Sequence, residues 1–552
     1  MNRKKSVLLL WAAGLFVLTG CTKEEDSYKE PLVVDVYDSL SDYQGLQTGW
    51  YAKVLEEKFR LQLNFLDKSQ ESSLKQADLF VCSQEDVSAK ELLSRGYLLN
   101  LEPLLEEGFP ENGELVDYRE SYEYWNEQLN QEGIYVLPTL VSRLSELTPS
   151  EENIPRYGVY LNWEAYENIG MPDIDDMEEC LDVLEEMQDA AESEGISQDG
   201  MLLYTDNDTD LLDHISSLMG ALGGQREGFL INIEGRYEEL LDKDSLYLDA
   251  LEWLREAYNR GLIAEDADKL GEEQVLERFR KGQVLLSLQP QENVEGYELA
   301  PVEDMKVVSH GCDPLGNLDH YVGISTGAKD PERILEFVDW LYSTEGIMLS
   351  GTETDLKAAG PQGLTWEVED GNPVLTEFGE QVFAQQIAVS FGGAKTQSVA
   401  VDAQVPAQWG QGTWQQGTCK LNLQTVTTVE VSPSGFAYNY TLWDTTIDRF
   451  TDSSPSWQER MEALEPMEYL IDHNRLAVIP AYTQDVVDKT HSYPQEIVDK
   501  RAACRQVIVD YSWQIIRSEK EEQSRELLKE MKAALSSVGY EEVLAYDREV
   551  VS

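Results

Sequence analysis

The sequence predicts an α/β fold, and three observations lead to that prediction. The chain has 552 residues, 42% of them hydrophobic, which is enough for several folded units with buried cores. Short β-rich runs alternate with helical runs between residues 31 and 96. Strand–helix–strand repetition of this kind implies a parallel sheet. We therefore expect several domains, or two large ones, of the α/β class.

Each element of this first stretch has its own signal. β-Branched and aromatic residues, or strict apolar–polar alternation, predict strands at 31–37, 61–65 and 77–81. Apolar residues at helical spacing predict helices at 49–59 and 89–94, the second closed by Gly96. Ligands of parallel sheets bind at the carboxyl ends of the strands. The loops 38–47 and 82–86 are therefore the expected binding loops.

A second region begins near Pro138. Helical periodicity predicts helices at 211–222, 247–258 and 334–342, and the Asp330-Pro331 pair opens the last of these with proline at a favoured first position. Residues 392–418 are rich in Gln, Gly and Trp and are expected to form a long loop or a small β insert. The tail from 483 to 546 is expected to be mostly helical.

The charge of the chain excludes two classes of partner. There are 104 acidic against 43 basic residues, so the formal net charge is −61. Nucleic acid binding draws much of its affinity from Lys and Arg on phosphates, and a surface this negative repels a phosphate backbone. Anionic lipid surfaces are disfavoured for the same reason. A neutral or cationic partner is expected, with no nucleic acid.

The N-terminus supplies a different route to the membrane. Three basic residues are followed by an uncharged apolar run from Val7 to Leu18, which is too short to span a bilayer. The run ends in Leu18-Thr-Gly-Cys21, which resembles the bacterial lipobox. This resemblance implies a signal peptide at 1–20, lipidation of Cys21 (as palmitate and related acyl chains) and a tether at 21–30. The mature protein is then expected on the extracellular face of the cell membrane, held by lipid.

Six motifs, in a fixed order, resemble those of a known family. They are residues 94–102 (Ser-Arg-Gly-Tyr-Leu-Leu-Asn-Leu-Glu), 133–138 (Gly-Ile-Tyr-Val-Leu-Pro), 162–170 (Asn-Trp-Glu-Ala-Tyr-Glu-Asn-Ile-Gly), 279–282 (Phe-Arg-Lys-Gly), 339–346 (Asp-Trp-Leu-Tyr-Ser-Thr-Glu-Gly) and 363–367 (Gly-Leu-Thr-Trp-Glu). Together they resemble the extracellular solute-binding proteins of bacterial ABC importers, in particular the sugar-binding lipoproteins. Each motif is weak by itself, and their common order carries the resemblance.

The resemblance implies a periplasmic-binding-protein-like fold. Two α/β lobes would be joined by crossing hinge segments and would close over a ligand in the cleft between them, like a Venus flytrap. We expect lobe 1 to hold residues 31–137 and about 290–350. Lobe 2 is expected to hold 138–289 and about 351–552, including the helical C-terminal segment.

Eight residues are candidates for contact with the ligand. Topology alone selects those at strand ends, and exposed aromatic residues suit the C–H faces of sugars. Trp409 and Trp414 lie in the Gly/Gln-rich stretch, where loops often carry function. The candidates are Asp38, Tyr43, Gln44, Trp50, Ser83, Gln84, Trp409 and Trp414.

Catalytic and metal motifs are weak. Residues 323–327 match the G-x-S-x-G nucleophile elbow, but the predicted helix begins five residues after Ser325 instead of directly at the turn. Residues 206–210 begin like a calcium loop, yet Leu211 and Ser217 stand where Gly and Glu are required, so a helix N-cap is favoured. We expect no catalytic residue, no cofactor and no metal.

The cysteines after Cys21 show no metal or redox spacing. Cys82, Cys180, Cys312, Cys419 and Cys504 are far apart, and their odd number argues against a complete disulfide framework. Most are expected to be small buried hydrophobic residues, with one disulfide pair left open.

The sequence thus predicts a monomeric, lipid-anchored binding protein that captures a carbohydrate, in particular an oligosaccharide, and delivers it to the transmembrane subunits of an ABC permease. It would not be an enzyme. Two alternatives stay open at this point. One is a binding protein for a peptide or a cationic solute, which the negative surface would attract. The other is a surface glycosidase, which needs two carboxylates placed across a cleft.

Overall fold

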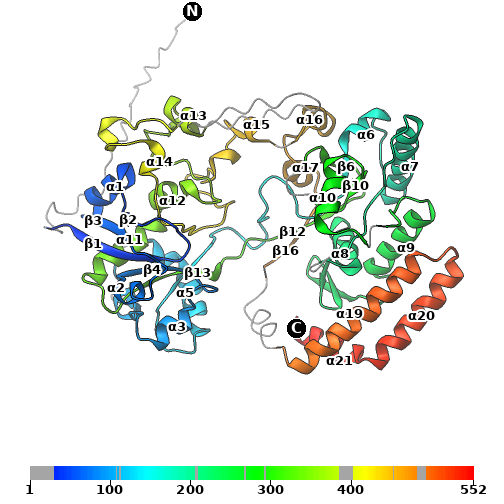
Figure 1. Cartoon of the computed structure of the whole chain (residues 1–552), viewed down its shortest axis with the longest axis horizontal. Coiled ribbons are helices and arrows are strands. Elements are labelled where there is room, and N and C mark those ends of the chain that lie inside the picture. The colour runs from blue at the N-terminus through cyan, green and yellow to red at the C-terminus, as the bar shows by residue number, and fades with distance from the viewer. Residues whose placement is uncertain are drawn as a thin grey trace, which may run out of the picture.

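The computed structural model describes residues 30–551 except 107, 111–112, 206–208, 267–268, 291–293, 384–401, 452 and 482–492. Figure 1 shows two lobes side by side, with only a few segments passing between them. The predicted α/β class and two-lobed arrangement are confirmed. The signal peptide and Cys21 lie outside the described residues.

Lobe 1 is built on a six-stranded sheet. Its order is β2-β3-β1-β4-β13-β5, from strands β1 (Leu32–Asp38), β2 (Gly45–Leu46), β3 (Leu61–Phe65), β4 (Leu79–Ser83), β5 (Leu137–Thr139) and β13 (Asn317–Ile324). β1 is parallel to both β3 and β4, as predicted, while β13 runs antiparallel to β4 and β5. The predicted strand at 77–81 is displaced by two residues, because Ala77 and Asp78 still belong to the turn that follows α2.

The other elements of lobe 1 are helices and two short strands. They are α1 (Gly49–Phe59), α2 (Ser73–Gln76), α3 (Ala89–Ser94), α4 (Glu102–Glu106), η1 (Glu114–Tyr118), α5 (Arg119–Glu127), α11 (Pro331–Leu341), α12 (Thr344–Ser350), η3 (Gly351–Glu353), β14 (Trp366–Glu369), β15 (Asn372–Leu375), α13 (Glu377–Phe383), η4 (Ala407–Trp409), α14 (Trp414–Gly417) and η5 (Tyr440–Leu442). The helix predicted from Asp330-Pro331 is confirmed, since Asp330 caps it and Pro331 is its first residue.

Lobe 2 is smaller in its sheets and richer in helices. Its strands are β6 (Tyr160–Asn162), β10 (Leu286–Ser287) and β11 (Tyr297–Leu299) in one sheet, and β7 (Gln225–Glu227), β8 (Leu230–Ile233) and β9 (Arg236–Glu239) in another. Its helices are α6 (Trp163–Asn168), α7 (Met177–Ser193), α8 (Leu211–Ala221), α9 (Leu246–Asn259), α10 (Glu272–Arg280), α16 (Pro455–Met461), α17 (Pro466–Asp472), α19 (Gln495–Ile516), α20 (Glu521–Ser537) and α21 (Tyr540–Val550). The predicted helical tail is therefore present from residue 495 onward.

The two cores divide the chain differently from the predicted lobe boundaries. Trp366, Trp414 and Tyr438 are buried with Val34 and the other residues of the lobe 1 core, so the described residues of 351–443 belong to lobe 1. Residues from Leu299 to Val307 were expected in lobe 1, but those of them that are buried and apolar pack in the core of lobe 2. The reason is that the third crossing lies near α15 (Ile447–Phe450) instead of near residue 350, where the predicted boundary placed it.

The first two crossings are hydrogen-bonded to each other. The Ser150 N–H donates to the carbonyl of His310 at 2.8 Å, and the Cys312 N–H donates to the carbonyl of Thr148 at 2.8 Å. β12 (Val307–His310) also pairs in parallel with β16 (Leu476–Ile479). A Cβ added at Gly311 would lie 1.6 Å from the carbonyl oxygen of Glu146, so the close approach of these crossings requires glycine at this position.

None of the helices in the described ranges is both long and apolar enough to cross a bilayer.

Candidate functional site

The carboxyl ends of the parallel strands in lobe 1 share one edge of the sheet. β1, β3 and β4 end at Asp38, Phe65 and Ser83, and β5 leads at Thr139 directly into the first crossing. The second crossing returns to the same edge, because β13 begins at Asn317. This edge of lobe 1 therefore faces the segments that lead to lobe 2 (Figure 1).

Lobe 2 brings the end of β10 to the same crossings, although its sheets are antiparallel. Segments around Asp199, Met201 and Ile263 run parallel to the chain that enters β10. Where that chain leaves β10, the carbonyl of Leu288 accepts the N–H of Gly158, just after the first crossing. The strand ends of both lobes thus flank the crossing segments. In open α/β sheets this is the place where ligands bind.

Asp38 lies at the predicted strand end, but the fold uses its carboxylate internally. Its side chain is 3% exposed. Oδ1 accepts the N–H groups of Leu40 at 2.9 Å and Ser41 at 3.1 Å, and Oδ2 accepts the N–H of Asn422 at 3.2 Å. Burial raises the pKa of the Asp38 carboxyl to about 6, against the opposing effect of these three donors. Asp38 shapes the loop that carries the site and ties it to residue 422.

Ser83 and Gln84 lie at the end of β4 and are half-buried. The Ser83 N–H donates to Oγ of Ser39 at 2.9 Å, which joins the ends of β1 and β4. Oε1 of Gln84 accepts the N–H of Ala89 at 3.0 Å and so stabilises the first turn of α3. The structure brings Asp38 and Ser83 to the same edge, as predicted from topology, since the two strands that end there are neighbours.

Tyr43 and Gln44 are the more accessible members of the predicted set. The Tyr43 ring packs edge-on against Phe65, its hydroxyl donates to the carbonyl of Leu46 at 2.7 Å, and Nζ of Lys420 lies 5.9 Å from the ring centroid. Gln44 is exposed. Because Tyr43 is only half-buried and Gln44 is exposed, both side chains remain accessible at this edge.

Trp50 and Trp414 were expected to face a ligand, and the structure places both in the lobe 1 core. Their rings stack at 5.0 Å with an interplanar angle of 11°, and the Trp50 Nε1–H donates to the carbonyl of Trp414. Trp50 is fully buried and Trp414 is 2% exposed. The reason is that α14 docks on the first turn of α1, where Gly49 and Gly417 allow close backbone contact. Trp409 remains half-buried beside this cluster.

The stretch that follows α14 supplies site residues that sequence reasoning missed. Gln47 is buried and joins the two segments, since Nε2 donates to the Thr418 carbonyl at 2.9 Å and Oε1 accepts the Lys420 N–H at 2.9 Å. Nδ2 of Asn422 donates to the carbonyl of Leu40 at 3.1 Å while the residue stays exposed. No periodicity or motif signals these contacts, because they join positions more than 370 residues apart.

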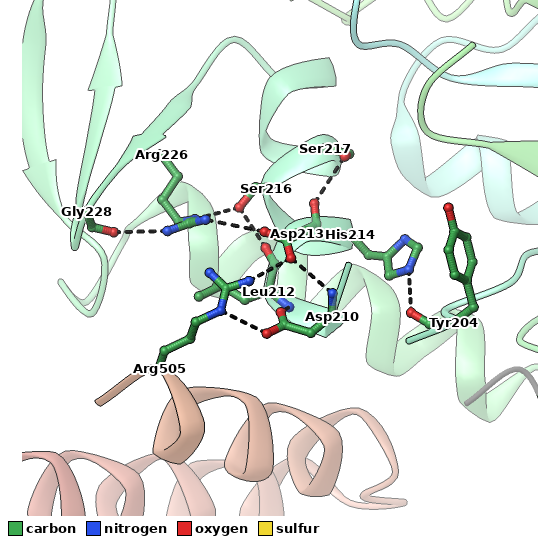
Figure 2. Close-up of polar contacts among 10 residues, drawn as sticks. All are labelled: Tyr204, Asp210, Leu212, Asp213, His214, Ser216, Ser217, Arg226, Gly228 and Arg505. Atoms are coloured by element: carbon green, nitrogen blue, oxygen red, sulfur yellow. Dashed lines mark hydrogen bonds and ion pairs between the residues drawn. The ribbon is translucent and has the colours of Figure 1, made fainter. Parts of the chain in front are cut away.

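Tyr204, His214 and Gln289 lie together at the lobe 2 edge. They line a small cavity of about 20 Å³ with Ser217 and Ser287, which is room for about one water molecule. Nε2 of His214 donates to the carbonyl of Tyr204 at 2.9 Å, and the two rings meet edge to face at 4.8 Å (Figure 2). The lobe 2 edge thus combines the rings of Tyr204 and His214 with polar side chains beside them.

The N-terminus of α8 is held by four charged side chains, as Figure 2 shows. Asp210 caps the helix and forms a capping box with Asp213. Arg505 of α19 binds Asp210 at 2.8 Å and Asp213 at 2.6 Å, and Arg226 donates to Oγ of Ser216 at 2.7 Å. The prediction that Asp210 is an N-cap is confirmed. Residues 206–208 of the calcium-like run lie outside the described residues, and in the described part of the chain no cluster of three His, Cys, Asp or Glu could hold a metal.

Ser325 and the cysteines behave as structural residues. Ser325 follows β13, is 7% exposed, and accepts the Gly327 N–H at 3.1 Å, while α11 begins only at Pro331. The five described cysteines are buried and free. Burial raises the pKa of the Cys180 thiol to about 12, which keeps it protonated and unreactive.

Comparison with known proteins finds no matching family model and no matching curated protein. Solved structures do match. One is a Streptococcus pneumoniae ABC-transporter substrate-binding protein, FusA, as an EF-hand mutant in complex with fructo-nystose; it shows 13% identity and a TM-score of 0.47 over 94% of this chain and 99% of the other. A solute-binding protein from Bifidobacterium longum infantis, described as HMO-binding and ABC-transporter-associated, shows 12% identity and a TM-score of 0.47 over 95% and 98%. A sugar transporter from Arthrobacter chlorophenolicus with bound laminaribiose shows 10% identity and a TM-score of 0.34 over 92% and 99%. These are proteins of the kind that the sequence motifs resemble, and at such identities the likeness does not identify a ligand.

Proposed function

We propose that the protein is a solute-binding protein that captures an extracellular carbohydrate, in particular an oligosaccharide, between its lobes and delivers it to an ABC permease. The observation that carries the proposal is that strand ends lie beside the segments that cross between the lobes. Lobe 1 directs the carboxyl ends of its parallel strands at the crossing segments, and in lobe 2 the chain that leaves β10 bonds to Gly158 just after the first crossing, so a ligand there would touch both lobes at once. Lipid on Cys21 would hold the mature chain at the membrane.

The side chains at the two edges suit a neutral polar ligand. Lobe 1 offers the ring of Tyr43 and the amides of Gln44 and Asn422, and lobe 2 offers Tyr204 and Gln289. Aromatic rings pack on the C–H faces of sugars, while amides donate to and accept from neighbouring hydroxyl groups. Binding and release by this set requires no covalent step.

The crossing segments provide the movement that capture needs. Glu430 is 1% exposed and holds the first crossing to lobe 1, since Oε2 accepts the Ser142 hydroxyl at 2.6 Å and the Arg143 N–H at 3.1 Å. On the lobe 2 side, the Glu151 carboxylate accepts the hydroxyl of Ser309 on the second crossing. Residues between these two anchor points would absorb the dihedral change of closure.

Thermal shift and calorimetry against a panel of neutral oligosaccharides and of short peptides test the proposal. We expect stabilisation by an oligosaccharide, and about a tenfold loss of affinity when either Tyr43 or Tyr204 is replaced by Ala, because both lobes contact the ligand. Tyr258→Ala on α9 is the control and should leave affinity unchanged. Stabilisation by peptides alone would refute the carbohydrate assignment, and turnover of chromogenic glycosides would show an enzyme instead.

A cationic solute or peptide is the second candidate, and one feature favours it. Glu85, Asp86 and Asp319 are exposed at the lobe 1 edge, and the Gln84 N–H bound to the Asp319 carbonyl at 2.8 Å holds the two loops together. A positively charged ligand would be attracted to this edge. The same panel distinguishes the two, since affinity for a cationic ligand falls with added salt.

A further inference from the structure

The segment 418–427, which follows α14, crosses the strand-end edge of lobe 1 from one side to the other. At its start, the buried side chain of Gln47 accepts the N–H of Lys420 at 2.9 Å. Near its end, the carbonyl of Gln424 accepts the N–H of Leu140 at 3.4 Å. Gln47 follows β2 and Leu140 follows β5, and these are the two outer strands of the six-stranded sheet. The segment therefore spans the width of the sheet.

The side chains of this segment alternate between the core and the open side of the edge. Cys419, Leu421 and Leu423 are each 3% exposed and lie in the lobe 1 core. The even-numbered side chains between and after them are half-buried or exposed: Lys420, Asn422 and Gln424, here called the polar ladder. A period of two is that of an extended chain, which places the first and last members of the ladder about 13 Å apart along the backbone.

Each member of the polar ladder is fixed by one part of its side chain and keeps another part for a ligand. Nζ of Lys420 donates to two oxygen atoms of residues 415–418, at 2.8 and 2.9 Å, and an ammonium group carries a third N–H. Nδ2 of Asn422 and Nε2 of Gln424 each donate to a backbone carbonyl, at 3.1 and 3.0 Å. Among the described residues, no donor binds Oδ1 of Asn422 or Oε1 of Gln424. The ladder is thus preorganised, which lowers the entropic cost of binding.

One donor and two acceptors in a row suit a ligand that carries many hydroxyl groups, because a hydroxyl group both donates and accepts. The Tyr43 ring lies beside the first member, with Nζ of Lys420 at 5.9 Å from its centroid, and offers a face for sugar C–H groups. A single sugar ring cannot reach from Lys420 to Gln424. A linear chain of sugars laid along the segment touches all three members.

We propose that the polar ladder selects the length and direction of the ligand: a linear oligosaccharide of at least three units lies across the strand ends, with one unit beside each member. The unit beside Lys420 packs on Tyr43 and accepts a hydrogen bond from the ammonium group. The next two units donate hydroxyl groups to Oδ1 of Asn422 and Oε1 of Gln424. This inference rests on the proposed function, since it concerns the same edge of lobe 1.

Calorimetry with linear gluco-, manno-, galacto- and fructo-oligosaccharides of one to five units tests the proposal. In a series that binds, affinity should rise about fivefold or more with each unit up to three. The double variant Asn422→Ala/Gln424→Ala should reduce the gain in affinity between one and three units by about tenfold. The matched control is Asn372→Ala/Gln362→Ala, at exposed positions in and beside the β14–β15 hairpin, and it should leave the gain within about twofold. Asn422→Asp keeps the Oδ1 acceptor and loses the bond to the loop, so it should retain most of the gain.

Three results would overturn the proposal, and they differ from one another. An affinity that does not depend on length, in a series that binds, would show a compact ligand and leave the proposed function intact. Equal weakening at every length in Asn422→Ala/Gln424→Ala would show that the ladder only holds the loop after β1. Binding of no series at all would refute the proposed carbohydrate function, and the role of the ladder with it.

Discussion

Replacing Trp414 with Ala separates a core residue from a ligand-binding one. The Trp414 ring is 2% exposed, stacks on Trp50 at 5.0 Å and meets Phe383 edge to face at 5.5 Å. Truncating a fully buried Trp costs about 3–5 kcal/mol, and lost aromatic pairs are part of that cost. For a lobe of roughly 200 residues this corresponds to a fall of about 6–20 °C in the melting temperature of lobe 1.

Differential scanning calorimetry measures the fall in melting temperature directly, and ligand titration below the melting temperature measures whether affinity also changes. We expect Trp414→Ala to melt far earlier while its affinity for the best ligand of the panel stays within about twofold. Trp409→Ala, at a half-buried position, should cost much less stability. The double variant Trp50→Ala/Trp414→Ala should be less destabilised than the sum of the single variants, because both remove the same stack.

An unchanged melting temperature together with lost ligand affinity in Trp414→Ala would refute the core assignment. It would return Trp414 to the role that its Gly/Gln-rich surroundings suggested. Trp414→Phe controls for general disruption, since it retains an aromatic ring against Trp50 and should recover part of the lost stability.

Three further predictions follow from the crossings, the loop after β1 and the N-terminus. Gly311→Ala should destabilise the protein by about 1–3 kcal/mol, because its Cβ would lie 1.6 Å from the Glu146 carbonyl oxygen. Small-angle scattering should also show an altered arrangement of the lobes in this variant. Gly327→Ala is the control: the nearest atom to its Cβ would be 3.5 Å away, so both stability and lobe arrangement should stay unchanged. The Asp38 carboxyl has a raised pKa of about 6 in the folded protein, so its contribution to stability is greatest below its ordinary pKa and is lost as the pH rises toward 6. Urea unfolding between pH 4 and pH 7 should show the wild type losing on the order of 3 kcal/mol relative to Asp38→Asn, and parallel pH profiles would contradict this. Cys21→Ser should abolish metabolic labelling with palmitate and release the protein from membranes, and continued membrane retention would argue against a lipid anchor.

Local elements were predictable because their signals are local. The helix α1 spans the predicted residues 49–59, since its apolar spacing needs no tertiary partner to be recognised. The Asp210 cap and the Pro331 start of α11 were visible for the same reason, because each satisfies the backbone of its own first turn. The edge that carries Asp38 and Ser83 followed from strand order alone.

The lobe boundaries and the roles of the tryptophans were not predictable in this way. The described residues of 351–443 pack with strands far before them in the sequence, and the third crossing, which was expected near residue 350, lies near α15, where no motif signals it. A tryptophan in a Gly- and Gln-rich loop has the same local surroundings whether it meets a ligand or a core. The docking of α14 on α1 decided between these two roles for Trp414.

The sequence by itself determined the α/β class, three strands and two helices between residues 31 and 94, the acidic composition and the candidate lipid anchor, since each depends on residue type and short-range spacing. Only the tertiary structure decided which segments share a core, that the Asp38 carboxylate accepts three backbone N–H groups, and that the strand ends of lobe 1 and the end of β10 lie beside the crossings. The physical reason is that these features are contacts between segments distant in sequence, whose energies come from burial and hydrogen bonding in the assembled fold.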